Sequence, residues 1–146
     1  MKKIFFGLLG ILVAIQFIRP NFNNPNIDEK IALQADEKVM TVLKKACYDC
    51  HSNETNYPFA HNIAPASWVI ADHVKEGRIA LNFSQWETID PTTKTTRIKR
   101  AKQLVSNGLM PIASYTMIHK EARLDSTEKE MLEQFFDTQL EKLKKL

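Results

Sequence analysis

The chain has 146 residues, of which 44% are hydrophobic and 25% are charged, a composition typical of one folded domain. Its four Gly and six Pro exclude collagen-like and low-complexity chains. Lys2, Lys3 and Arg19 supply three of the 20 basic residues, and the 17 that remain balance the 17 acidic residues. This balance argues against a general nucleic-acid-binding surface, which needs an excess of cations facing the phosphates. Two Cys are also too few for a disulfide-stabilised secreted scaffold.

The N-terminal segment combines a positive start with an apolar run. Two lysines precede an uncharged stretch at residues 4–18, which Arg19 ends. This pattern is typical of an export signal, although it is shorter than the about 20 residues of a membrane-spanning helix. The side chains around Phe17 are too bulky for signal peptidase, so we expect residues 1–19 to remain as an anchor at the periplasmic side of the inner membrane. Cleavage, which would release the protein into the periplasm, is the alternative.

The rest of the chain is expected to consist of a linker and one domain. Residues 20–29 contain two Pro and four Asn and little that can form a core, so they predict a tether. From residue 30 to residue 146, apolar side chains recur every three or four positions, which is the helical period. A short extended piece at residues 79–83 has no partner strand. The domain is therefore predicted to be all-α, with about four helices.

Capping and turn residues set the expected limits of these helices. The first runs from Lys30 to Ala46 and leads into Cys47. The second begins at Pro65 and ends at Gly77. The third begins after Asp90 and closes at Asn107 and Gly108 in a left-handed cap, and the last begins near Thr127, with Glu130 completing a capping box.

The main chemical signal is Cys47-Tyr-Asp-Cys50-His51. At the end of a helix, positions 47, 50 and 51 put two thiols and one imidazole on the same face. This spacing is that of haem attachment, in which the thiols add to the two vinyl groups of a porphyrin and the imidazole ligates the iron. We therefore expect one covalent haem c, with Cys47 and Cys50 as the thioether sites and His51 as the proximal ligand.

Other interpretations of the motif are open at this point. A thioredoxin-type redox pair needs a strand before the motif, which this chain does not predict. A structural zinc site would take its fourth ligand from His61, His73 or His119. A plain disulfide would leave His51 without a role.

The distal ligand is expected to be Met110. It follows the predicted helix cap at Gly108, and Pro111 stiffens the segment, so the thioether can reach the iron without breaking a helix. A core position is the ordinary alternative for a Met. His73 and His119 are the alternative distal ligands, and either would give a lower reduction potential than Met110.

Five stretches of the chain together carry a family resemblance. They are residues 47–55, 62–68, 73–78, 81–86 and 108–111, with Tyr115 and His119 beyond. They resemble the bacterial haem-binding domain family, which carries a single Cys-x-x-Cys-His, and the likeness covers roughly residues 30–145. The resemblance implies a c-type haem protein with a cytochrome c-like fold, commonly with an N-terminal membrane anchor. In cytochromes c the Met of a Met-Pro pair is the usual distal ligand, which supports Met110.

Three classes of function fit such a haem. We expect an electron carrier rather than an enzyme, with the haem buried under the side chains of Trp68, Phe83, Trp86, Phe135 and Phe136. A peroxidase-like enzyme would need a replaceable Met110 and a distal acid or base such as His73. A haem-based sensor would bind a gas at an open sixth position.

The redox partner cannot be named from the sequence. A stripe of cations on the third helix could dock one, or it could be an ordinary solvated face. The stripe consists of Lys94, Arg97, Lys99, Arg100 and Lys102.

Overall fold

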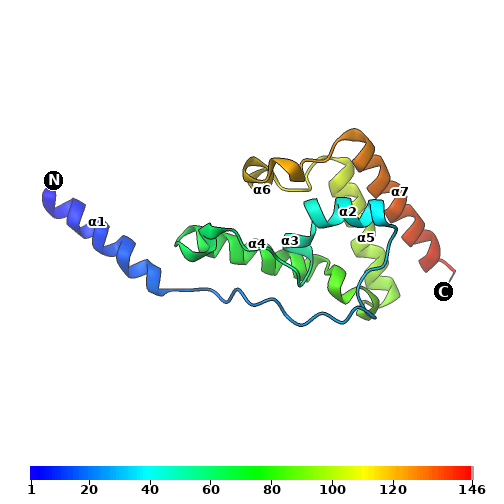
Figure 1. Ribbon diagram of the computed structural model, residues 1–146, viewed down its shortest axis with the longest axis horizontal. Coiled ribbons are helices and arrows are strands. Elements are labelled where there is room, and N and C mark those ends of the chain that lie inside the picture. The colour runs from blue at the N-terminus through cyan, green and yellow to red at the C-terminus, as the bar shows by residue number, and fades with distance from the viewer. Residues whose placement is uncertain (146) are drawn as a thin grey trace.

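The computed structural model describes residues 1–145, and the regular secondary structure in that range is all helical, with no strand (Figure 1). The α-helices are α1 (Lys2–Ala14), α2 (Glu37–Ala46), α3 (Tyr48–His51), α4 (Ala66–Ala80), α5 (Pro91–Ser106), α6 (Ala113–Ile118) and α7 (Ser126–Leu143). Short 3-10 helices connect them: η1 (Ile15–Phe17), η2 (Phe59–Asn62), η3 (Phe83–Thr88) and η4 (Lys120–Ala122). The all-α prediction is confirmed, although the described part of the body has two short α-helices, α3 and α6, beyond the four expected.

The first helix of the body is shorter than the sequence predicts. It begins at Glu37 instead of Lys30, because the Asp36 side chain accepts a 3.0 Å hydrogen bond from the N–H of Val39 and caps it there. Most of the preceding residues are irregular and are held by η3, where the N–H of Leu33 donates to the carbonyl of Phe83 at 2.8 Å. The apolar residues before Asp36 therefore do not form a helix, and Leu33 is buried in an irregular segment.

The other helix ends agree with the expected caps in part. Asp90 caps α5 and Gly108 follows it with a φ of 66°, as predicted. Helix α4 continues to Ala80, three residues beyond the expected end at Gly77. The capping box of α7 consists of Asp125 and Glu128 instead of Thr127 and Glu130, because Asp125 is the residue that has the extended backbone of an N-cap.

The core lies where α2, α5 and α7 meet, at the C-terminal end of α4 (Figure 1). Its buried apolar side chains are Leu33, Val39, Val42, Leu43, Tyr48, Leu81, Phe83, Trp86, Ile98, Val105, Leu132, Phe135 and Phe136. Helix α4 extends from this core toward the N-terminal helix, and α6 lies on the other side of the molecule from the linker (Figure 1). The layout leaves α3 between the core and α4.

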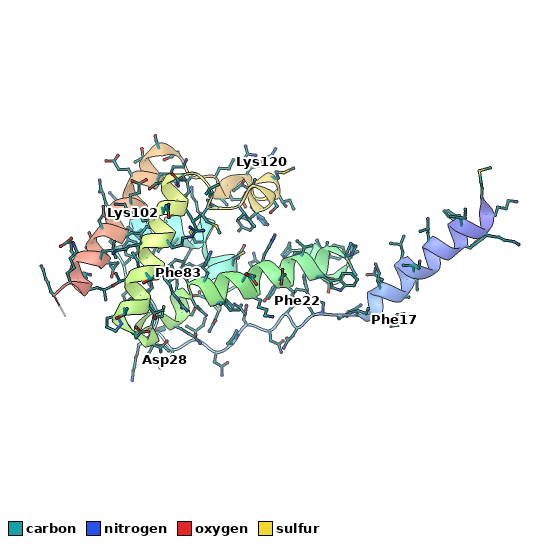
Figure 2. All side chains as sticks on the ribbon, turned by 180° about the vertical axis from the view of Figure 1, so that it is seen from behind. Phe17, Phe22, Asp28, Phe83, Lys102 and Lys120 are labelled. Carbon is teal, nitrogen blue, oxygen red and sulfur yellow. The ribbon has the colours of Figure 1, made fainter. Side chains whose placement is uncertain are left out.

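The linker is hydrogen-bonded to the body along α4. Asn24 donates to the carbonyl of Thr55 at 3.0 Å and accepts from the Arg78 guanidinium at 2.7 Å. Figure 2 shows Phe22 beside α4 and Phe17 at the base of α1. Residues 20–29 are irregular up to the turn that begins at Glu29, yet they are held along the surface and not free.

Helix α1 has 13 residues, and its side chains are exposed. Within residues 1–145, no helix has the combination of length and apolar character that crossing a membrane requires.

Candidate functional site

The Cys-x-x-Cys-His motif lies at a sharp change of direction in the chain. Cys47 ends α2 and begins α3, and its carbonyl accepts from the N–H groups of Cys50 at 3.2 Å and His51 at 2.9 Å. Tyr48 is buried and stacks on Phe83 with ring centres 5.4 Å apart. Because Tyr48 points into the core, the single turn of α3 is held in place although it is too short to be stable alone.

A backbone carbonyl orients the imidazole of His51. Its Nδ1 lies 3.0 Å from the carbonyl oxygen of Leu81, the residue that follows α4. A carbonyl can only accept, so Nδ1 carries the proton and Nε2 keeps its lone pair for a metal. Burial lowers the pKa of His51, although the bonds to the backbone of Leu81 and Gly77 oppose this shift. The imidazole is therefore neutral at pH 7, which is the form that ligates iron.

The two thiols are protonated at neutral pH. Burial raises the pKa of Cys47 to about 12 and that of Cys50 to about 11. A thioredoxin-type pair works through a thiolate with a lowered pKa, so the surroundings of these thiols argue against that interpretation. Within residues 1–145, no three His, Cys, Asp or Glu side chains are grouped to hold a metal ion, so a zinc site has no support either.

Met110 lies at the same cavities as the motif. Two small cavities, of about 40 and 50 Å³, are both lined by Cys47, His51, Met110 and Pro111. The backbone places Met110 there, because its N–H donates to the carbonyl of Leu104 at 3.2 Å in the cap that closes α5. The structure thus brings together the proximal and distal ligands expected from the sequence.

A larger cavity adjoins this site between α4 and α6. It has a volume of about 380 Å³ and a mostly apolar lining. Asp49, Cys50 and Tyr115 line both this cavity and the small cavity of about 40 Å³. His73 and His119 line this cavity but neither of the cavities that His51 and Met110 share. Of the three candidate distal ligands, Met110 is therefore the one that lines the same cavities as His51.

His61 lies apart from these cavities. Its Nδ1 is 2.7 Å from the carbonyl of Pro58, and its ring packs against Phe22 and Tyr57, with centres 5.0 and 5.6 Å away. It belongs to the contact between linker and body.

Comparison with known proteins identifies the family. The model of the haem-binding domain family matches residues 10–138, which is most of the chain. The chain belongs to the haem-binding domain family. The match begins inside the apolar N-terminal segment, earlier than the residue near 30 at which the resemblance was expected to start. No curated protein and no solved structure matches the chain.

The residues of this haem-binding domain fit a haem. The lining of the three cavities is mostly apolar, which suits a porphyrin, and it includes a neutral imidazole, a thioether and two thiols. Cys47, Cys50, His51 and Met110 are the residues that would hold the group.

A buried polar network that the sequence does not predict holds together the segments on either side of His51. The Asn82 side chain donates to Oδ1 of the Asn53 side chain at 2.9 Å, and the backbone N–H of Asn53 donates to the Ser84 hydroxyl at 2.9 Å. These bonds join the loop after His51 to the turn that contains Leu81. In the sequence, this network corresponds only to short polar residues that flank apolar ones. Such a pattern by itself is typical of turns.

Gly77 has a role that differs from the expected helix end. A Cβ atom at this position would lie 2.4 Å from the carbonyl oxygen of Cys50. Only Gly therefore lets α4 approach the backbone of the motif this closely.

Four of the five aromatic side chains expected to cover the haem do not line the three cavities. Trp68 lines none of the three cavities, because its Nε1 donates to the carbonyl of Ile18 at 2.8 Å and the ring packs toward the linker. Phe83 does line one of the small cavities, while Trp86, Phe135 and Phe136 belong to the core behind it.

The cationic stripe of α5 is also smaller than expected. Lys94 is buried over the ring of Trp86 and pairs with Glu87 at 3.1 Å. Lys102 pairs with Asp137 at 2.6 Å. Two of the five cations are therefore tied to carboxylates, and a redox partner would meet the other three.

Proposed function

We propose that this haem-binding domain carries one haem c, attached through Cys47 and Cys50 with His51 and Met110 as axial ligands, and that it transfers electrons at the periplasmic face of a membrane. The observation that carries the proposal is that Cys47, His51 and Met110 line the same two cavities. Residues 4–18 would serve as the anchor, because their apolar side chains are exposed and two lysines precede them.

The chemistry that the bound group supplies is an iron that changes between the ferrous and the ferric state. The protein's part is to hold its own ligands still and to set the polarity around them. The carbonyl of Leu81 keeps Nε2 of His51 free and fixes the ring. The thioether of Met110 favours the ferrous state over the ferric one and so raises the reduction potential relative to a second His.

Electron transfer is favoured over peroxidase or gas-sensing chemistry by the position of Met110. An enzyme or sensor needs an open or readily replaced sixth position. Met110 is held at its backbone by the cap of α5, and the acid–base candidates His73 and His119 line the neighbouring cavity. A ligand pair that stays in place during the redox cycle is what an electron carrier requires.

The test is expression with the c-type maturation machinery, followed by extraction of the purified protein with acidified organic solvent. We expect the haem to stay with the protein, and to stay in Cys47→Ala and Cys50→Ala through the one remaining thioether, with the α-band shifted to longer wavelength by the unreacted vinyl group. In the double variant the haem should be fully extractable or absent. Lys99→Ala, an exposed change on α5, is the control and should keep its haem. Full extraction of haem from the unsubstituted protein would refute covalent attachment.

The reduced protein is then exposed to carbon monoxide. An electron carrier with His51 and Met110 in place should leave its spectrum unchanged. A rapid and complete shift of the spectrum would point to an open sixth position and to the enzyme or sensor alternatives.

A further inference from the structure

The end of the body nearest to α1 exposes apolar side chains to solvent. Phe59 on η2 is 79% exposed and Ile63, directly after η2, is 47% exposed. In the segment that leads from α1 to the linker, Phe17 and Ile18 are 85% and 64% exposed. Apolar side chains left in water forgo the free energy of burial, and four of them gathered at one end of the molecule are typical of a surface that is covered by a partner or a membrane.

These two pairs of side chains are held at the same place by hydrogen bonds. The Gln16 side chain donates to the carbonyl of Ala64 at 3.0 Å and accepts from the N–H of Ala64 at 2.9 Å. The indole of Trp68 donates to the carbonyl of Ile18 at 2.8 Å. The base of α1 is thus fastened to the N-terminal end of α4, and Figure 1 shows that end of α4 as the part of the body closest to α1.

We propose that Phe59 and Ile63 insert into the lipid surface, so that the body rests on the membrane by the N-terminal end of α4. The proposal rests on the anchor of the proposed function and adds the surface and the orientation by which the body meets the bilayer. The occupant is a lipid bilayer because the patch is continuous with the apolar segment that would already lie in it.

The length of α1 supports this contact. Its 13 residues span about 20 Å and the three of η1 add about 6 Å, against about 30 Å for the hydrocarbon core. A short apolar segment that enters the bilayer draws its flanking residues toward the interface. The residues at that end of the segment are Gln16, Phe17 and Ile18. Gln16 is bonded to Ala64 and the carbonyl of Ile18 to Trp68, so both are brought toward the interface with them. An indole beside them suits the interface, where Trp is enriched.

The experiment uses the full-length haem protein in phosphatidylcholine nanodiscs, prepared with and without bromine on the acyl chains. Bromine quenches tryptophan emission only at short range, and the ratio of the two preparations cancels any quenching by haem. Three single variants are compared with the unsubstituted protein: Phe17→Trp in the anchor, Phe59→Trp at the proposed contact, and Ile79→Trp near the other end of α4. Ile79 is 60% exposed and is the matched control.

We expect the emission added by Phe17→Trp and by Phe59→Trp to be lost in the brominated discs, and that added by Ile79→Trp to be retained. If only Phe17→Trp is quenched, the anchor holds and the proposed contact of the body is wrong. If Phe17→Trp is not quenched either, the anchor fails and the contact fails with it. Equal quenching of Phe59→Trp and Ile79→Trp would also overturn the proposal, because the contact would not be specific to one end of α4.

A second measurement needs no substitution. Amide hydrogen exchange of residues 58–63 is compared between nanodiscs and detergent micelles, with residues 78–82 as the reference. Slower exchange in nanodiscs at residues 58–63 alone is expected. Unchanged exchange there would contradict the proposed contact.

Discussion

The Tyr115 hydroxyl donates a 2.7 Å hydrogen bond to the carboxylate of Asp49, the residue that precedes Cys50 in the attachment motif. Burial, and then the bond to Asp49, raise the pKa of Tyr115 far above its ordinary value, so the hydroxyl keeps its proton and remains a donor. The bond joins α6, which follows Met110, to α3, which carries His51. It therefore connects the two sides of the candidate haem site.

Loss of this bond should destabilise the protein. Tyr115→Phe keeps the ring that stacks on His119 and removes only the donor, so we expect the free energy of unfolding to fall by about 1–2 kcal/mol. Urea denaturation followed by circular dichroism measures this change. Thr116→Ala, which removes an exposed local bond on the same helix, should change it by less than about 0.5 kcal/mol. An equal effect of the two variants would contradict a special role for the bond.

Met110→Ala should remove the distal ligand. We expect loss of the weak long-wavelength absorption band that a thioether gives to ferric haem, a lower reduction potential, and carbon monoxide binding to the reduced protein. His73→Ala and His119→Ala should keep the band, since neither side chain lines the cavities shared by His51 and Met110. If the parent lacks the band and Met110→Ala leaves its spectrum and potential unchanged, while His73→Ala or His119→Ala alters both, the ligand is that His and the Met110 assignment is wrong. Absorption spectra and a redox titration distinguish these outcomes.

Gly77→Ala should be harmful although Ala is the better helix former. The added Cβ would lie 2.4 Å from the Cys50 carbonyl oxygen, and both atoms belong to backbone segments that cannot move freely. We expect a loss of about 1–3 kcal/mol in stability and a lower yield of attached haem. Gly10→Ala meets no atom within 4 Å and serves as the control. A stability equal to that of the parent would mean that α3 and α4 can separate at no cost.

Asp90 should contribute to the loss of folding stability at low pH. The backbone N–H of Thr93 holds the pKa of Asp90 below its ordinary value of 3.8. The unfolded chain therefore takes up this proton first as the pH falls, so the stabilisation is present above the unfolded pKa and is lost below it. Asp90→Asn keeps a capping oxygen that does not titrate. Its melting temperature, relative to that of the parent, should rise as the pH falls from about 5 to about 3. A constant difference across that range would contradict this assignment.

Lys94→Ala tests a cation that the sequence places on the surface and the fold buries. The side chain covers the ring of Trp86, with Nζ 5.2 Å from its centre, and pairs with Glu87. We expect a loss of about 1–2 kcal/mol from the missing packing and cation–π contact. Lys99→Ala on the exposed side of α5 should be close to neutral. Thermal unfolding of both variants provides the comparison.

The sequence was sufficient wherever the deciding interaction is local. The spacing of Cys47, Cys50 and His51 is a property of one helical turn, so their common face follows from the backbone geometry. The caps at Asp90 and Gly108 likewise depend on neighbouring residues, and both were predicted correctly. Periodicity also settled the all-α class.

Tertiary structure decided everything that depends on residues distant in the chain. The apolar pattern before Asp36 predicts a helix. In the structure, the N–H of Leu33 instead donates a hydrogen bond to the carbonyl of Phe83 in η3, and the segment is irregular. The cluster of like charges on α5 predicts that Lys94 is exposed. The side chain is buried because it packs on Trp86 and pairs with Glu87, which belong to the preceding segment.

The candidate distal ligands also separate into what the sequence determines and what depends on the tertiary structure. The sequence offered Met110, His73 and His119 as alternatives, because each lies downstream of the motif at a reachable distance along the chain. Only the fold puts Met110 at the cavities of His51 and the two histidines at the adjoining one. The residue type determines which group a side chain can offer, but the packing of the helices around the motif determines which cavity that group lines.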